Sequence, residues 1–241
     1  MSIKTILITG ATSGIGLALF EKYVALGHNV IACGRDEKKL SLLSTKAYKT
    51  YLFDLNDAQS IAEQLQDVPN LDVVILNAGD CRYIDDARHF DGKLFTDIIS
   101  TNLASLGWLL QFTLPRVNKN GQVVFVSSSA TILPFPRSEA YGASKAGIDY
   151  LANSLRLDLA DENIDVTLVH PGFVKTPLTD KNDFVMPFLI TSDEAADRII
   201  VGVDQRKKYL HFPKRLTFLL KLLSFLPSAV WQRIISRKHK A

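Results

Sequence analysis

The sequence predicts a doubly wound α/β fold, in which helices cover both faces of a parallel sheet of about seven strands. Short apolar or β-branched runs alternate with longer stretches whose apolar residues are spaced three and four apart. Several of these runs are apolar almost throughout, which is typical of strands buried on both faces of a parallel sheet. The expected strands are Thr5–Thr9, Asn29–Cys33, Thr50–Phe53, Asp72–Leu76, Gln122–Ser127, Asp165–Val169 and Lys208–Phe212.

Composition indicates a globular, cytoplasmic protein. Of the 241 residues, 47% are hydrophobic and 22% are charged, and no Pro/Gly/Ser-rich linker divides the chain. Cys33 and Cys81 are the only cysteines, too few for a disulfide framework, so a reducing compartment is expected. The sequence shows neither a signal-peptide pattern nor an uncharged stretch of transmembrane length.

Charge is distributed unevenly along the chain. The formal net charge is +3, but from Gln205 onward there are ten Lys or Arg residues and no Asp or Glu. A basic end on an acidic body requires a separate explanation. We therefore expect a domain over residues 1–213 and an amphipathic basic tail over residues 214–241.

A glycine-rich turn joins the first expected strand to the first helix, with the sequence Thr9-Gly10-Ala11-Thr12-Ser13-Gly14-Ile15-Gly16. Glycines at such a turn let backbone N–H groups approach a pyrophosphate at the positive end of the helix. Gly16 would also allow close helix–strand packing. Any strand–helix junction can use glycine simply to turn, but a position directly after the first strand favours a dinucleotide site.

The G-x-x-x-G-x-G spacing of this turn resembles that of the short-chain dehydrogenase/reductase family, in its compact single-domain, Rossmann-like branch. The resemblance continues in register from about Thr5 to Thr176. It implies an oxidoreductase that transfers a hydride between nicotinamide and a carbonyl or secondary alcohol, in a homodimer or homotetramer. The further motifs that carry it are Asp54-Leu55, Asn77-Ala78-Gly79, Asn102, Ser128, Tyr141-x-x-x-Lys145 and Pro171-Gly172.

The resemblance also implies a set of cofactor contacts. Asp54 would bind the adenine amino group, although it could instead cap the next helix, a role that Asp57 could equally fill. Val174 and Thr176 would contact the nicotinamide carboxamide. Leu76 replaces an asparagine usual in the family, which should leave the chemistry unaffected. The implied contacts are Gly10, Thr12, Ser13, Gly14, Ile15, Gly16, Asp54, Leu55, Asn77, Ala78, Gly79, Tyr141, Lys145, Pro171, Gly172, Val174 and Thr176.

The end of the second expected strand bears on the choice between NAD and NADP. An NAD enzyme of this fold usually has an acid there, which binds the ribose 2′-hydroxyl and would repel a 2′-phosphate. The matching residue is Gly34, and it is followed by Arg35, whose side chain suits a phosphate. Arg35 could instead be an ordinary surface charge, and Asp36 adds an acid nearby. The missing acid favours NADP(H).

Tyr141 and Lys145 lie four residues apart in a helix expected over Glu139–Ala160, so they share one face. Hydride transfer to a carbonyl leaves an alkoxide that needs a proton, and a phenol can supply it. An ammonium nearby would lower the phenol pKa from its usual value of about 10. The alternative is an ordinary amphipathic helix, but the accompanying motifs favour catalysis.

Ser128 and Asn102 complete the catalytic set that the resemblance implies. Ser128 would hydrogen-bond the substrate oxygen, and only spacing distinguishes it from Ser127 and Ser129. Asn102 would organise a water chain to Lys145; alternatively, it is a polar helix residue that bonds the backbone. A non-catalytic NADP(H) sensor or a membrane-docking protein on the same fold is the alternative function, against which the intact catalytic set counts.

Other chemistries lack the residues they need. The five histidines are scattered and form no metal-ligand spacing with the cysteines, so no metal is expected. Ser128 lacks the G-x-S-x-G setting of a hydrolase nucleophile. The basic residues belong to no nucleic-acid-binding module, so no nucleic-acid partner is expected.

Two apolar segments follow the last motif. Phe184–Ile190 lies where the family closes over its substrate, which indicates an apolar substrate, unless the segment packs on the core or on another subunit. In the tail, Leu216, Leu219, Leu220 and Leu223 form a stripe at helical spacing, and Trp231 belongs to a second amphipathic stretch. The tail would lie on a membrane surface, with Trp231 at the interface, or pack against a second subunit.

Overall fold

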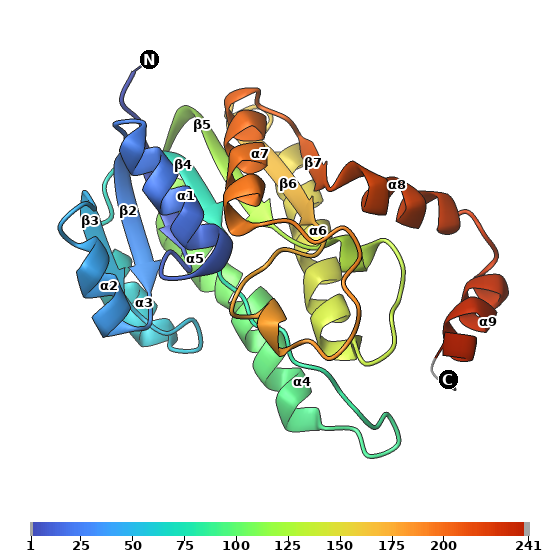
Figure 1. Ribbon diagram of the computed structural model, residues 1–241. Coiled ribbons are helices and arrows are strands. Elements are labelled where there is room, and N and C mark those ends of the chain that lie inside the picture. The colour runs from blue at the N-terminus through green and yellow to red at the C-terminus, as the bar shows by residue number, and fades with distance from the viewer. Residues whose placement is uncertain (1, 239–241) are drawn as a thin grey trace.

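The computed structural model describes residues 2–238, and it contains the predicted doubly wound sheet (Figure 1). Seven parallel strands are paired in the order β3-β2-β1-β4-β5-β6-β7 within these residues. The strand order reverses direction between β1 and β4, which creates a crevice at their carboxyl ends. The strands are β1 (Thr5–Thr9), β2 (Asn29–Gly34), β3 (Lys49–Leu52), β4 (Leu71–Leu76), β5 (Val117–Val126), β6 (Asp165–Pro171) and β7 (Tyr209–Phe212).

Helices cover both faces of the sheet, as the sequence predicts. On one face lie α1 (Gly14–Ala25), α2 (Glu37–Leu43) and α7 (Ser192–Asp204), and on the other lie α3 (Ala58–Leu65), α5 (Ser105–Thr113) and α6 (Glu139–Asp158). A further helix, α4 (Gly92–Ile99), packs against α6.

Strand β4 shows why the near-continuous apolar runs become central strands. Val73 and Ile75 belong to the core on one face of the sheet, whereas Val74 and Leu76 belong to the core on the other. Successive side chains of a strand point to opposite faces, so a strand covered on both sides must be apolar at every position.

The C-terminal segment forms two helices, α8 (Lys214–Leu223) and α9 (Ser228–Lys238), which extend along one side of the domain (Figure 1). The predicted stripe is divided: Leu216 and Leu220 are buried, whereas Leu219 is exposed. None of the described helices is both long enough and apolar enough to cross a bilayer.

The predicted position of Trp231 at a membrane interface is wrong. Its side chain is only 7% exposed, and its Nε1 donates a hydrogen bond to the carbonyl oxygen of Pro134 at 2.8 Å. The indole also contacts the ring of Phe135 edge to face, with centroids 5.7 Å apart. Spacing along one helix indicates an apolar face but cannot show that the same chain covers it.

Candidate active site

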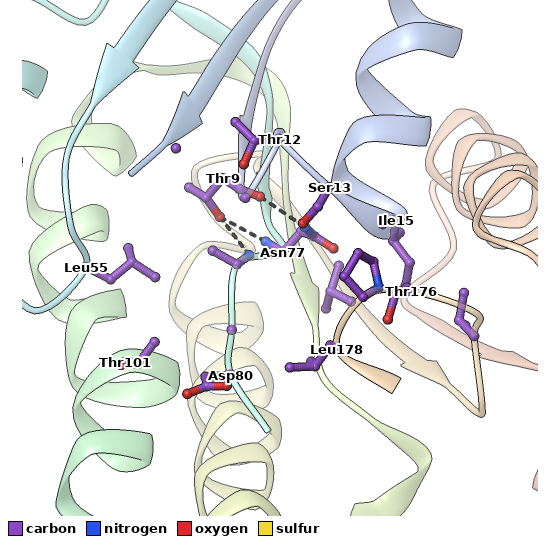
Figure 2. Close-up of a pocket in the computed structure, with 18 of the residues that line it drawn as sticks. Thr9, Thr12, Ser13, Ile15, Leu55, Asn77, Asp80, Thr101, Thr176 and Leu178 are labelled. Carbon is purple, nitrogen blue, oxygen red and sulfur yellow. Dashed lines mark hydrogen bonds between the residues drawn. The ribbon is translucent and has the colours of Figure 1, made fainter. Parts of the chain in front are cut away.

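A cleft of about 500 Å³ opens at the carboxyl ends of β1 and β4, and it collects most of the predicted site residues. Figure 2 shows residues from β1, α1, β4 and the segment after β6 around this space. Two predicted residues, Gly16 and Asn102, do not line the cleft. The predicted residues that line it are Gly10, Thr12, Ser13, Gly14, Ile15, Arg35, Asp54, Leu55, Asn77, Ala78, Gly79, Ser128, Tyr141, Lys145, Pro171, Gly172, Val174 and Thr176.

The glycine-rich turn has the close packing expected of a nucleotide cradle. Gly10 has φ +67°, and a Cβ atom there would lie 2.9 Å from the Cα atom of Ala78. Gly16 packs behind the turn, where a Cβ atom would collide with the carbonyl oxygen of Gly10. Helix α1 therefore packs closely at Gly16 on the ends of β1 and β4. The N-terminus of α1 therefore faces the cleft with little side-chain bulk between its N–H groups and a ligand.

Thr9 joins the two strands that form the cleft, a role that sequence reasoning missed. Its Oγ1 accepts hydrogen bonds from the backbone N–H groups of Asn77 and Ala78, at 3.0 and 3.1 Å. The side-chain amide of Asn77 donates in return to the carbonyl oxygen of Thr9 at 3.1 Å (Figure 2). In the sequence, only the position of a threonine directly after the apolar run Ile6–Ile8 could have indicated this role. These bonds fix the turn after β1 against the end of β4.

The distal end of the cleft, beyond β2, carries two cations. Arg35 is largely exposed, and its Nη1 lies 3.6 Å from Oδ2 of Asp54. Lys39, on the first turn of α2, also lines the cleft, and sequence reasoning missed it. Asp36 is occupied as the N-cap of α2, where its side chain accepts from the N–H of Lys39 at 3.1 Å. The acid next to Arg35 is therefore engaged by its own helix.

Asp57, and not Asp54, fills the alternative role of helix cap. Asp57 is the N-cap of α3 and accepts from the N–H of Ser60 at 3.0 Å. Asp54 accepts from the N–H of Asn56 at 2.8 Å and lies in the cleft.

At the opposite end of the cleft lie Tyr141 and Lys145, one turn apart on α6, and Ser128, just after β5. The Nζ of Lys145 donates to the carbonyl oxygen of Val126 at 3.0 Å and lies 5.7 Å from the centroid of the Tyr141 ring. Ser128 interacts with the Tyr141 hydroxyl. The neighbouring Ser127 donates to Asp149 instead, at 2.5 Å. The choice of Ser128 by spacing therefore agrees with the geometry.

Burial controls the protonation of this pair. It raises the pKa of Tyr141, with a smaller increase from the charge of Cys81, and the hydrogen bond with Ser128 opposes it. Burial likewise lowers the pKa of Lys145 to about 8, against a smaller opposing influence of the Cys81 and Asp149 charges. The expected lowering of the Tyr141 pKa by Lys145 is not found, because burial raises that pKa instead.

Asn102 lies in a π-helical turn, Ser100–Ala104, between α4 and α5. It is fully buried, and its Oδ1 accepts from the N–H of Asp80 at 2.7 Å. Its Nδ2 donates to the carbonyl oxygen of Asp80 and to Oγ of Ser144, at 2.8 and 2.9 Å. π-helical turns are frequent at functional sites. Asn102 thus bonds the backbone beside the cleft, and its water chain stays a prediction.

The segment after β6 forms the remaining wall. In Figure 2, Thr176 lies beside Ile15 of the glycine-rich turn, and Leu178 projects into the cleft below it. In the apolar segment that follows, Phe184 contacts the rings of Phe173 and Tyr83, with centroids 6.0 and 5.8 Å apart. Apart from Thr9 and Lys39, the cleft residues that the sequence analysis did not assign are Cys33, Gly34, Phe53, Asp80, Thr101, Val126, Ser127, Pro177, Leu178, Thr179 and Lys181.

Comparisons with known proteins show the family of the chain. Residues 4–184 match the family model of the short chain dehydrogenases. An uncharacterized oxidoreductase of Myxococcus xanthus is 31% identical over 98% of both chains. A probable NADP-dependent dehydrogenase of Haemophilus influenzae is 33% identical, over 71% of this chain and 72% of its own.

A solved structure of similar architecture is the closed form of a serine dehydrogenase complexed with NADP+. It superposes with a TM-score of 0.77 at 25% identity, over 86% of this chain and 94% of the other. Because the family model matches most of the chain, this chain belongs to the short-chain dehydrogenase/reductase family and is an oxidoreductase of that family.

Proposed function

We propose that the protein is an NADP(H)-dependent oxidoreductase that acts on a carbonyl or secondary alcohol, with Tyr141 as general acid and base. One observation carries this proposal: a single cleft brings the glycine-rich turn together with Ser128, Tyr141 and Lys145. A nucleotide cradle alone would fit a sensor equally well. A half-buried phenol beside a buried amine supports proton transfer as well.

The cleft fits a dinucleotide with a 2′-phosphate. Gly10 and Gly14 carry no side chain at the lining of the cleft, so a pyrophosphate could approach the N-terminus of α1. Asp54 and Leu55 would hold the adenine, and Arg35 with Lys39 would bind the 2′-phosphate. Similarity to an NADP-complexed serine dehydrogenase supports the same choice. When bound, the nicotinamide supplies or accepts the hydride.

The chain's own residues would manage the substrate oxygen and its proton. Ser128 donates a hydrogen bond to that oxygen, and Tyr141 gives it a proton during reduction or removes one during oxidation. Lys145, when charged, stabilises the Tyr141 phenolate left by reduction and binds the ribose. Asn102 supports the backbone of Asp80, and it would organise a water chain to Lys145.

The proposal extends to the substrate and to assembly. The aromatic contacts among Tyr83, Phe173 and Phe184 support an apolar substrate. A homodimer or homotetramer is supported by exposed Trp108 on α5 and Leu157 on α6, which are 46% and 78% exposed. We also propose a cytoplasmic protein whose tail, residues 214–241, makes a peripheral contact with a membrane surface.

The test is a panel of aliphatic and aromatic aldehydes and ketones, run with NADPH and with NADH, while thermal shift records nucleotide binding. We expect NADPH to stabilise the protein and to support turnover of at least one carbonyl. Binding of NADPH with no turnover across the panel would favour the sensor. Absence of a thermal shift with either nucleotide would contradict both functions.

A further inference from the structure

The two C-terminal helices divide their apolar side chains between an inner and an outer face. The inner face consists of Leu216, Leu220 and Trp231, which are all at most 7% exposed. The exposed apolar side chains of the same segment form what we call the outer face, and Phe225 is the most exposed of them, at 87%. Exposed apolar residues that gather in one part of a surface usually mark a contact site. The outer face consists of Phe218, Leu219, Leu222, Phe225, Leu226, Val230 and Ile234.

The inner face connects the tail to both segments that flank the chemical end of the cleft. Leu133, from the segment between Ser128 and Tyr141, is buried in one cluster with the inner face, and Phe173 packs against that cluster. A Cβ atom on Gly172 would lie 2.7 Å from Cδ2 of Leu216, so α8 sits directly against the Pro171-Gly172 turn. The tail is thus part of the structure around the active site.

The charges around the outer face indicate which kind of partner it would bind. Arg215 and Arg233 are exposed on α8 and α9, and no acidic residue follows Gln205. Lys214 and Lys221 lie beside β7, where the Nζ of Lys221 is 4.4 Å from the centroid of the Tyr209 ring. Within the tail, exposed apolar side chains are accompanied by cations and by no acid, a combination that matches an anionic lipid surface. Packing the outer faces of two copies together would bring like charges into contact.

We propose that the outer face docks on an anionic lipid bilayer and thereby brings the chemical end of the cleft to that bilayer. The substrate would then be an apolar carbonyl or alcohol dissolved in the membrane. The proposal of docking depends only on the residues of the tail, whereas the proposal of a membrane-dissolved substrate rests on the proposed oxidoreductase function. Phe173 links the two: it packs on the inner-face cluster and also contacts Phe184 of the apolar segment beside the cleft.

The docking is tested by sedimentation with vesicles of phosphatidylcholine and phosphatidylglycerol in equal parts. The full-length protein should sediment with these vesicles at low salt but not with phosphatidylcholine alone, and added salt should release it, because salt screens exposed charges. In a triple variant, Phe218→Ser, Leu222→Ser and Phe225→Ser, the bound fraction should fall by about tenfold or more, since three large apolar side chains no longer enter lipid.

Leu42→Ser is the matched control, because Leu42 is 75% exposed on α2, a helix remote from the tail. It should sediment as the unchanged protein does. Failure of the full-length protein to bind anionic vesicles at low salt would overturn the proposal. A change in oligomeric state in the triple variant, without any vesicle binding by the unchanged protein, would identify a second copy as the true occupant.

The orientation is tested with a polarity-sensitive dye on a single introduced cysteine, after Cys81→Ser removes the partly exposed native thiol. Val185 is 87% exposed in the apolar segment beside Phe184, so a dye on V185C should shift to the blue when vesicles are added. A dye on L42C, at the other end of the domain, should not shift. A shift at L42C alone, or equal shifts at both positions, would overturn the orientation.

Turnover separates this inference from the proposed function. For a long-chain aldehyde carried in the vesicles, the triple variant should show a several-fold higher KM with little change in kcat. For a short, water-soluble aldehyde, both constants should match those of the unchanged protein. Unaltered kinetics with the vesicle-borne aldehyde would overturn membrane delivery. If no carbonyl is turned over, the proposed function fails, and sedimentation and dye shifts still decide the docking.

Discussion

The carboxylate of Asp149, one turn after Lys145 on α6, lies 2.9 Å from Nε2 of His170 at the end of β6. The same carboxylate oxygen accepts from Oγ of Ser127, which follows β5. On its other side, Nδ1 of His170 lies 3.0 Å from the hydroxyl of Tyr209 on β7. Through the half-buried Asp149, the helix that carries the proposed catalytic pair is therefore bonded to Ser127 after β5 and to His170 on β6, and His170 extends the connection to β7.

Asp149→Asn should alter catalysis through Lys145, because Asp149 is a positioning residue that touches neither substrate nor cofactor. Its charge raises the pKa of Lys145, so its loss should lower that pKa further below about 8. The alkaline limb of the kcat profile for carbonyl reduction should then move to lower pH. Asp158→Asn, on the exposed end of α6, is the control and should leave the profile unchanged. An unmoved limb in Asp149→Asn would contradict the coupling.

Lys145→Met should stabilise the fold while abolishing most activity. Burial lowers the pKa of Lys145 from 10.5 to about 8, a change equivalent to about 3 kcal/mol of unfavourable free energy in the folded state. Loss of the hydrogen bond from Lys145 to Val126 should cancel about 1 kcal/mol of the stability gained by removing this penalty. At pH 7 the variant should therefore unfold with a free energy about 2 kcal/mol higher than the unchanged protein, measured by urea denaturation.

The difference in stability between Lys145→Met and the unchanged protein should depend on pH. Below about pH 8 the folded and unfolded states both carry the ammonium, so the penalty in the unchanged protein is complete. Between about pH 8 and 10.5 the unfolded state binds more protons, and the unchanged protein gains stability as pH rises. The advantage of Lys145→Met should disappear by about pH 10.5. A variant less stable than the unchanged protein at pH 7 would show that Lys145 is not penalised by burial.

Tyr141→Phe should remove the proton donor while the ring is retained. Turnover of a confirmed carbonyl substrate should fall by roughly 100-fold to 10,000-fold, the usual contribution of general acid–base catalysis. Thermal stability and the NADPH-induced thermal shift should be nearly unchanged. Tyr150→Phe, on the exposed side of the same helix, controls for loss of a phenol and should be fully active. Near-normal turnover in Tyr141→Phe would exclude the proton-transfer role.

The sequence predicted local features well because local patterns specify them. All seven expected strands lie within one or two residues of those observed, except that β5 begins at Val117 rather than Gln122. Asn120, with φ +63°, and Gly121 interrupt the apolar run, and the pairing of β5 with β4 shifts register between Leu71 and Val73. A turn-like sequence therefore hid the start of a strand that tertiary pairing extends.

Two of the missed features, those of Trp231 and Thr9, depend on contacts between residues far apart in the sequence. Trp231 resembles a membrane anchor along its own helix, and only the fold brings it to Pro134. Lys39 carries no motif, and it reaches the cleft because Asp36 fixes the start of α2. Thr9 likewise acquires its role when β1 and β4 pair. Sequence patterns predicted most of the residues that line the cleft but not the contacts that hold them in place.

The preference for NADPH should depend on Arg35 and Lys39 together. A phosphate held by charged side chains gains roughly 1.5–3 kcal/mol per hydrogen bond, so Arg35→Ala should weaken NADPH binding by about tenfold or more. Lys39→Ala should have a smaller effect, because a lysine ammonium lacks the planar fork with which an arginine binds a phosphate through two hydrogen bonds. The dissociation constant for NADH, which has no 2′-phosphate, should change little in either variant.

Lys38→Ala provides the control for these two variants, because Lys38 is exposed on the same turn of α2 but does not line the cleft. Its dissociation constants for both nucleotides, measured by calorimetry at one ionic strength, should match those of the unchanged protein, since screened surface charge contributes little. If Arg35→Ala weakens NADH and NADPH equally, its effect lies in shaping the adenine end with Asp54 and not in binding a phosphate. If the unchanged protein prefers NADH, the assignment of NADP(H) from Gly34 and Arg35 is wrong.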